Sequence, residues 1–219
     1  LVEPGSKDSA GHTPGRRCGQ FLTRGAKTTS LLGAYIMKGV EMSDQPLGYF
    51  DKFKGEKPTS GLPYPKLFEV LISGLGGFVI MAILYLLHAD LEVILCFIIP
   101  FGASAVLVFA APAAPFSQPR NVIGGHVIAS LVGVTVAVLF KQNVWWTIAI
   151  ANGVAIALMV ATKTVHPPAG ATALLPIISN ITDYTWVILP VFVGTLIIVA
   201  VGLLYNNLWK KRKYPAWWW

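Results

Sequence analysis

The segment that decides the fold is residues 164–175, Thr164-Val165-His166-Pro167-Pro168-Ala169-Gly170-Ala171-Thr172-Ala173-Leu174-Leu175. It places an imidazole, two prolines and a run of small residues within an otherwise apolar part of the chain. A proline has no N–H and a fixed φ, so the pair can begin a helix but cannot continue one. We therefore expect a helix that starts at about Pro168 and leaves three backbone N–H groups without helical partners, those of Gly170, Ala171 and Thr172.

A helix start of this kind inside a membrane protein has two interpretations. A helix N-terminus carries roughly half a positive charge and suits a small anion, and glycine lets a ligand approach the backbone closely. In lipid, a broken helix is tolerated where it is packed in protein as well as where it lines a wet cavity. The segment thus predicts either a packed kink or a solute site.

Charged residues are few and unevenly distributed along the chain. They make up 12% of the 219 residues, and the mean hydropathy is +0.62. Between residues 67 and 209 the charged residues are only Glu69, Asp90, Glu92, Arg120, Lys141, Lys163 and Asp183. This pattern is typical of a polytopic membrane domain preceded by a polar segment. The net charge of +7 is then explained by topology and by contacts with lipid headgroups, and no nucleic-acid partner is expected.

Four regions follow from this distribution. Residues 1–41 are basic and rich in hydroxyls without a sustained apolar period, and we expect an upstream, disordered or leader segment there. Residues 42–66 are expected to form a polar surface segment, 67–209 the transmembrane domain, and 210–219 a basic and aromatic tail. The two cysteines, Cys18 and Cys96, have no ligand-like spacing and are not expected to meet.

The apolar stretches predict an all-α, polytopic transmembrane helical bundle of about six spans. Five stretches approach the roughly 20 residues that a crossing needs, namely 67–87, 91–111, 122–140, 144–162 and 184–207. The stretch 167–178 is shorter and suits a short span or a re-entrant, proline-broken helix. Because basic residues flank both ends of the domain, the positive-inside rule favours an even number of crossings and therefore six. Five helices with a re-entrant loop form the alternative.

An internal repeat strengthens the expectation of six spans. Residues 100–107 (PFGASAVL) align with residues 168–175 (PAGATALL), with five of eight positions identical and Ser104 matched to Thr172. A unit of three spans repeated in one chain gives an inverted 3+3 topology, in which the matched broken elements meet near the midplane. That arrangement favours a substrate pathway between the two proline-containing segments.

Small residues recur at helical spacing on three spans. They are Ala149, Gly153, Ala157 and Ala161 on one span, Gly125, Ala129 and Gly133 on another, and Ser73 and Gly77 on the first. Such ribbons let helix backbones approach closely in lipid. They predict packing within one chain or between subunits, so a homo-oligomer is one expected partnership.

The candidate substrate-binding residues lie on or beside the two repeated segments and the span between them. They are Gly102, Ser104, Arg120, Asn121, His126, Asn152, His166, Pro167, Pro168, Gly170, Ala171 and Thr172. We expect helix N-termini at Gly102 and Gly170, with Asn121 as an N-cap and Arg120 as a fixed cation. Arg120 could instead extend to lipid headgroups, and His126 could serve as an interhelical hydrogen-bond partner. The histidines lack metal-ligand spacing, so no metal and no cofactor are expected.

Two motifs in order resemble a known family. The run from His166 to Ala173 (HPPAGATA), with residues 116–121 (FSQPRN) and Gly125-His126 upstream, is similar to the HPP family of integral membrane proteins, named for the tripeptide. The resemblance covers roughly residues 65–207. Some members carry cystathionine-β-synthase-type domains, which are not expected in this chain. Plastid and cyanobacterial members are linked to nitrite transport, so the resemblance implies nitrite or a similar small anion as substrate.

Three functions are compatible with these residues. The first is a transporter or channel for a small anion within the lipid bilayer, in which His126 and His166 couple anion movement to protons. The second is an intramembrane serine hydrolase, with Ser104 as nucleophile and His166 as base. The third is a non-transporting scaffold. We favour the transporter, and thus no enzyme, in a bacterial or cyanobacterial plasma membrane in preference to a plastid membrane.

Overall fold

The computed structural model describes residues 65–87 and 91–218, apart from the side chains of 91–97. The segment expected at 1–41 and most of the expected surface segment, up to residue 64, lie outside these ranges. Within them all regular structure is helical, as predicted. The helices are α2 (Leu67–Leu86), α3 (Leu91–Ala105), α4 (Pro119–Phe140), α5 (Trp145–Ala161), α6 (Ala169–Ile178) and α7 (Val193–Asn207). Short π-helical and 3₁₀ turns add Val106–Ala110, Val187–Phe192 and Pro115–Ser117.

Three of these helices are long and apolar enough to cross a membrane. They are Leu67–Leu86, Pro119–Phe140 and the combined π-helical turn and α7, Val187–Asn207, with mean hydropathies of 2.3, 2.2 and 2.8. Shorter apolar helices cover Ile98–Ala110, Trp145–Ala161 and Ala169–Ile178. Large apolar side chains face outward on every one of these six segments, which is the surface that a bilayer would cover.

The described part of the chain runs along the bundle six times, and its contacts show where each pass ends. Arg212 bonds to Glu69 at the start of α2 and to the Phe109 carbonyl at the end of the second pass. Tyr214 bonds to the Ser117 carbonyl just before α4. We call this the tail end. At the opposite end, the last residues of α4 and α6 line one hollow with Lys141 and Asn180. The segment 163–178 therefore runs from the tail end to the Lys141 end, beside α4.

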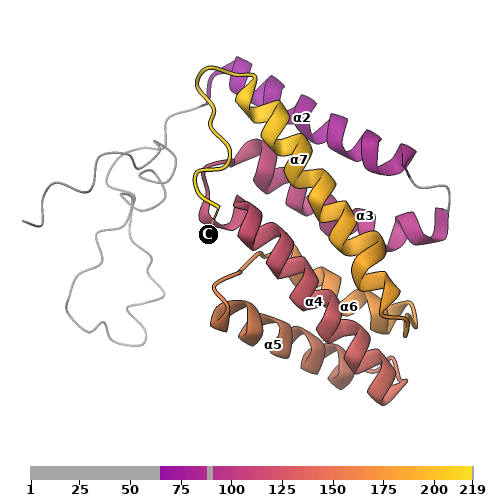
Figure 1. The fold of residues 1–219 in the computed structure, drawn as a ribbon. Coiled ribbons are helices and arrows are strands. Elements are labelled where there is room, and N and C mark those ends of the chain that lie inside the picture. The colour runs from indigo at the N-terminus through magenta and orange to yellow at the C-terminus, as the bar shows by residue number, and fades with distance from the viewer. Residues whose placement is uncertain (1–64, 88–90, 219) are drawn as a thin grey trace, which may run out of the picture.

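The bundle has two halves with two main hydrophobic cores (Figure 1), and a smaller cluster of Val134, Trp186 and Val191 joins α4 to the last pass. The first core joins α2, α3 and α7 around Ile80, Phe101 and Ile198. The second joins α4, α5 and α6 around Ala129, Ala155 and Ala173. The first half thus takes α7 from the other end of the chain, whereas the second half consists of three helices that are consecutive in sequence.

Helix ends follow local sequence. Pro119 occupies the first turn of α4, where its missing N–H costs nothing. The predicted N-cap at Asn121 is wrong, because α4 begins three residues earlier and Gln118 is the N-cap. After α4, α5 and α6 the chain turns through Lys141, Lys163 and Asn180, all with positive φ, as is common just beyond helix C-termini. The last pass bends at Leu189, directly before Pro190.

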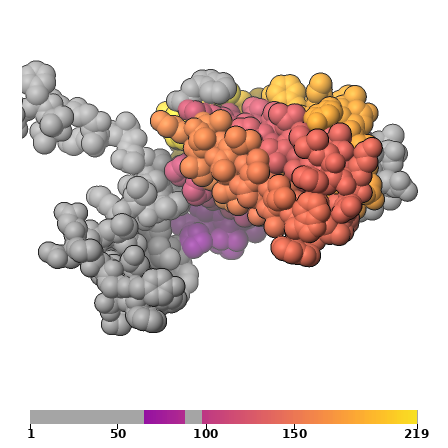
Figure 2. Space-filling view, turned by 90° about the horizontal axis from the view of Figure 1, so that it is seen from below, coloured from indigo at the N-terminus to yellow at the C-terminus, as the bar shows by residue number. Residues whose placement is uncertain are grey.

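The small-residue ribbons have different roles. A Cβ added to Gly133 would lie 2.4 Å from the Ala173 carbonyl oxygen, so this ribbon brings α4 against α6 within the chain. On α5 the buried residues are instead Thr147, Ala151, Ala155 and Met159. The ribbon that includes Gly153 faces outward with no atom within 4 Å of an added Cβ. Figure 2 shows α5 on the outer surface of the bundle.

Candidate functional site

Four polar side chains meet between the two halves of the bundle. Ser104 Oγ lies 2.8 Å from His126 Nε2 and 2.9 Å from His166 Nε2. His126 Nδ1 lies 2.7 Å from Thr172 Oγ1. The Nδ1 of His166 donates to the Phe116 carbonyl oxygen at 2.7 Å. We call these four residues, Ser104, His126, His166 and Thr172, the imidazole cluster.

The imidazole cluster is enclosed by protein on all sides. Ser104, His126 and His166 have relative exposures of 0%, and Thr172 has 1%. Ser104 comes from α3 in the first half, whereas the other three come from α4, α6 and the segment just before α6. The ring of Phe101 stands edge-to-face against His126, with centroids 5.1 Å apart. All four residues were predicted site residues, and the structure places them in one contact network.

Two glycines allow His166 to reach this depth. A Cβ on Gly125 would lie 2.7 Å from the His166 Cβ and 2.9 Å from the Thr164 carbonyl oxygen. A Cβ on Gly124 would lie 2.7 Å from the Thr164 Cγ2. The segment after α5 therefore packs directly on the backbone of α4, and any larger residue would push it away.

Asn121 fixes the same segment from α4. Its Nδ2 donates to the Val165 carbonyl at 2.8 Å, while its Oδ1 is buried with no hydrogen-bond partner among the described residues. The residue thus lies within the first turn of α4 as a clamp on the chain before His166, and does not act as the predicted cap.

The predicted free helix N-terminus at α6 is wrong. The N–H groups of Ala169, Gly170 and Ala171 donate to the carbonyls of His166, Pro167 and Pro168, respectively. The turn that precedes α6 is wound tightly enough for i to i+3 bonds, so these N–H groups are already paired. Pro168 is buried and Pro167 is exposed. The N–H groups of Gly170 and Ala171 are therefore not free donors for an anion, contrary to the prediction.

The predicted helix start at Gly102 is also wrong. The helix α3 runs from Leu91 to Ala105 with Pro100 inside it, so Gly102 is an interior helical residue. The nearest atom to a Cβ on Gly102 would be the methyl carbon of Met81, at 3.9 Å. The helix α3 packs against α2, α6 and α7, and neighbouring helices commonly allow a proline within a membrane helix.

Arg120 and Asn152 lie apart from the imidazole cluster. Arg120 Nη2 donates to the Thr162 carbonyl at 2.7 Å, at the tail end of α5. Asn152 is half-buried in the middle of α5, with its Oδ1 3.4 Å from the position of a Cβ on Gly170. The structure therefore does not bring the predicted fixed cation to the two histidines.

The serine–histidine pair predicted for a hydrolase is within hydrogen-bonding distance. The same hydroxyl is shared with His126, and the other nitrogen of His166 is bonded to a backbone carbonyl. Ser104 is also fully buried. The hydrolase alternative therefore stays a prediction.

A surface hollow lies away from the imidazole cluster, at the Lys141 end. It has a volume of about 280 Å³ and is lined by Ala137, Lys141, Gln142, Ile177, Asn180 and Thr182. Nearby, hydrogen bonding from the Thr185 side chain, and from the Thr185 N–H to the carboxylate, lowers the pKa of Asp183. Among the described residues, no three His, Cys, Asp or Glu side chains come together in a metal-binding group.

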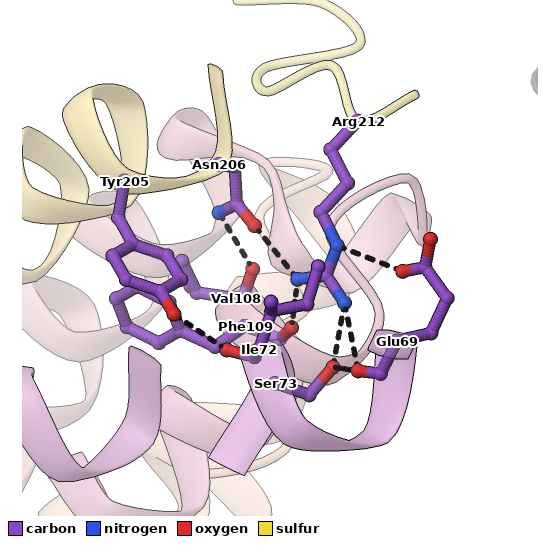
Figure 3. Close-up of polar contacts among 8 residues, drawn as sticks. All are labelled: Glu69, Ile72, Ser73, Val108, Phe109, Tyr205, Asn206 and Arg212. Carbon is purple, nitrogen blue, oxygen red and sulfur yellow. Dashed lines mark hydrogen bonds and ion pairs between the residues drawn. The ribbon is translucent and has the colours of Figure 1, made fainter. Parts of the chain in front are cut away.

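A second polar cluster, at the tail end, was not predicted. Figure 3 shows the guanidinium of Arg212 between α2, α7 and the end of the second pass. All of its N–H groups point at acceptors, namely the Glu69 carboxylate and carbonyl, Ser73 Oγ, the Phe109 carbonyl and Asn206 Oδ1. Its side chain is only 7% exposed. The basic run 210–213 was expected to face lipid headgroups, and Arg212 instead turns inward because these oxygens need a donor.

The chain after Arg212 continues across the same end. Tyr214 is buried and donates to the Ser117 carbonyl at 2.9 Å, and burial raises the pKa of the Tyr214 hydroxyl. Gln118 Oε1 accepts from the N–H groups of Ala216 and Trp217. Residues 214–217 of the tail thus bond to Ser117 and Gln118. The preceding residue, Phe116, provides the carbonyl that orients His166.

The family follows from a comparison with known proteins. Residues 62–215 match the family described as HPP, transmembrane region. The chain belongs to this family. The match includes both histidines of the imidazole cluster and extends into the tail as far as Tyr214 and Pro215, so both polar clusters of this HPP protein lie within the matched range.

Two relatives of this HPP protein are known from Dictyostelium discoideum. One transmembrane protein is 37% identical over 180 residues, which cover 78% of this chain and 57% of the relative. A second is 34% identical over 183 residues, which cover 78% of this chain and 63% of the relative. The chain therefore spans about three fifths of the length of the relatives it matches. No solved structure matches it.

These comparisons show that the chain is a membrane protein. They do not support the expected bacterial or cyanobacterial origin, because both relatives come from Dictyostelium. They also give no indication for or against an enzymatic activity.

Proposed function

We propose that this HPP protein is a membrane transporter or channel for a small inorganic anion, with nitrite as the first candidate. The observation that carries the proposal is the imidazole cluster, in which two histidines and two hydroxyls are buried between the halves of an apolar bundle. Ionisable groups at such depth are costly and usually serve transport or proton relay. The resemblance to nitrite-transporting members supplies the candidate substrate.

The arrangement of the repeated segments supports the proposal. Ser104 and Thr172 occupy matched positions of the repeat, and their hydroxyls contact the two nitrogens of one imidazole, His126. The helices that carry them, α3 and α6, run in opposite directions along the bundle. Repeated segments that meet at one site in opposite directions are expected of transporters with inverted repeats.

The two hydrophobic cores suggest how the site would open. Close backbone contact at Gly133 ties α4 to α6, so the second half is expected to move as one body. Ser104 is the member of the imidazole cluster that belongs to the first half. Separation of the halves would therefore expose both imidazoles and both hydroxyls as donors for an anion, whereas the described state is closed.

Flux in liposomes tests the proposal. The full chain, reconstituted in vesicles, is expected to give saturable nitrite uptake, with nitrate and chloride as comparison anions. His166→Ala is expected to lower the uptake rate at least tenfold, because it removes a donor that lines the site. Ser130→Ala is the matched control, since Ser130 is also a buried serine but bonds only to the Val127 carbonyl of its own helix.

The outcomes separate the candidate functions. Loss of uptake in His166→Ala, with normal uptake in Ser130→Ala and a folded protein in both, would support the transporter. Equal uptake in His166→Ala and the unsubstituted protein would refute this site. Absence of flux for all three anions in folded protein would favour the scaffold. Labelling by a fluorophosphonate probe that is lost in Ser104→Ala would instead revive the hydrolase.

A further inference from the structure

The hydrogen atoms available to the imidazole cluster can be counted. A serine hydroxyl has one hydrogen to donate and two lone pairs, and a neutral imidazole has one N–H and one acceptor nitrogen. Ser104 Oγ has three neighbours within bonding distance, the two imidazole Nε2 atoms at 2.8 and 2.9 Å and the Pro100 carbonyl oxygen at 2.9 Å. One hydroxyl hydrogen cannot serve all three, so the protonation of the rings decides which neighbour receives it.

The Phe116 carbonyl fixes one end of the chain of bonds. A carbonyl oxygen only accepts, so the His166 Nδ1 that lies 2.7 Å from it must carry a hydrogen. In a neutral His166 the Nε2 is then an acceptor, and it takes the hydrogen of Ser104. His126 must consequently donate from Nε2 to Ser104 Oγ and accept at Nδ1 from the Thr172 hydroxyl.

We infer that the imidazole cluster is a proton-binding site, in which two neutral histidines of opposite tautomer take up one proton between them. Its neutral form is a single directed chain from Thr172 through His126, Ser104 and His166 to the Phe116 carbonyl. The two rings are held by different partners, so neither can exchange tautomer without breaking a buried bond.

An added proton fits the existing positions of the atoms. When it binds at His166 Nε2, both Nε2–H groups donate to the two lone pairs of Ser104 Oγ. The serine hydrogen then turns to the Pro100 carbonyl, which is already 2.9 Å away. The new bonds replace the old ones without movement of heavy atoms.

The cluster holds one such proton and not two. The ring centroids of His126 and His166 are 4.9 Å apart, and two positive charges at that distance in a buried site repel strongly. The described side chains of the surrounding elements offer no carboxylate to offset a second charge. Arg120, the charged residue of α4, bonds to Thr162 at the tail end, and α5, α6 and α7 carry none. Glu92 lies in α3, twelve residues before Ser104.

Glu69 of α2 pairs with Arg212. Among the described side chains, the protonated cluster therefore has no counter-ion for its one positive charge. This uncompensated charge, together with the proposed function on which the prediction rests, predicts that one proton and one monovalent anion occupy the site together. The two would then cross the membrane as a neutral pair. The chain of bonds ends at a carbonyl, which cannot pass a proton onward, so the cluster stores a proton and does not form a proton wire across the bundle.

Nitrogen NMR of the full chain tests the tautomers directly. In protein with ¹⁵N-labelled histidine, and with His12 and His88 replaced by glutamine, the two remaining rings are His126 and His166. We expect one Nε2–H ring and one Nδ1–H ring at neutral pH, and one protonation event for the pair as the pH falls. Identical tautomers, or two independent protonation events, would overturn the inference.

Two variants and one control sharpen this test. Thr172→Val is expected to release His126 from its fixed tautomer and leave His166 unchanged, while Ser104→Ala is expected to affect both rings. Ser130→Ala is expected to change neither. An unchanged His126 in Thr172→Val would contradict the directed chain, and this variant keeps the shape of the side chain should Ser104→Ala fail to fold.

Flux measurements then distinguish this inference from the proposed function. One proton taken up per nitrite, without net charge movement, would support the coupling. Opposite tautomers without any anion flux would support the proton site and refute anion transport. Anion flux with identical tautomers would support transport and refute the proton site.

Discussion

Buried polar groups of this HPP protein are paired across long stretches of sequence, and Arg212 shows this most clearly at the scale of a residue. Its guanidinium joins the first turn of α2 to the end of the second pass and to α7 (Figure 3). Five N–H groups in a rigid fork match five surrounding acceptor positions, which an ammonium group with three donors cannot do. The residue is therefore structural and does not contribute to a headgroup-binding tail.

Substitution of Arg212 is expected to loosen the tail end. Arg212→Ala removes the donor from the partly exposed Glu69 carboxylate, from the Phe109 carbonyl and from Asn206 Oδ1, and leaving such acceptors without a partner costs about 1–3 kcal/mol. Arg212→Lys keeps the charge but is expected to recover only part of the loss. Thermal unfolding in detergent micelles measures the effect.

Lys213→Ala provides the control, because its side chain is exposed beside Arg212. It is expected to change the stability by no more than about 0.5 kcal/mol. Equal unfolding temperatures for Arg212→Ala and Lys213→Ala would show that the bonds at Arg212 contribute little.

At the scale of helices, small residues decide which surfaces meet. Gly125 and Gly133 lie against the segment 164–173, whereas Gly153 faces outward from α5. All three are helical glycines with similar sequence surroundings, and the difference arises from which face of each helix the bundle covers.

A pair of alanine substitutions separates the two ribbons. Gly133→Ala would force a Cβ to within 2.4 Å of the Ala173 carbonyl oxygen, and overpacking of this kind costs about 1–3 kcal/mol. Gly153→Ala meets nothing within 4 Å, and it is expected to be neutral or to stabilise by up to about 1 kcal/mol through helix propensity. Chemical unfolding of both variants measures the difference. A tolerated Gly133→Ala would contradict the close packing of α4 on α6.

At the scale of the whole molecule, the six passes predict which loops share a side of the membrane. Both ends of the described chain and the turn at Lys163 lie at the tail end, whereas the turns at Lys141 and Thr182 lie at the other. Six crossings place Lys163 and Thr182 on opposite sides. A re-entrant segment would place them on the same side.

Single cysteines decide between these topologies. In a background without Cys18 and Cys96, we expect Lys163→Cys and Lys210→Cys to react with an impermeant maleimide from one side of sealed, oriented vesicles. Lys141→Cys and Thr182→Cys are expected to react from the other side. Labelling of positions 163 and 182 from the same side would refute six crossings.

The sequence by itself determined the membrane bundle and most helix bounds. Hydropathy and proline positions are local properties, so the spans expected at 67–87 and 144–162 agree with α2 and α5 within one residue at each end. The N-cap of α4 was not predicted correctly from the sequence. Asn121 is an ordinary N-cap residue, but Pro119 allows the helix to begin earlier, and the amide then bonds to Val165. The composition also identified every member of the imidazole cluster as polar in an apolar setting.

Only the tertiary structure decided how these residues are used. Ser104 meets residues 22 and 62 positions away, and Arg212 meets one 143 positions away, contacts that no local pattern encodes. The helix start at Gly170 looked open in sequence, but its N–H groups are paired by the turn that carries His166 into the bundle. Buried polar groups must find partners wherever the fold brings them. The identity of each partner therefore depends on how six helices pack, and not on any one of them.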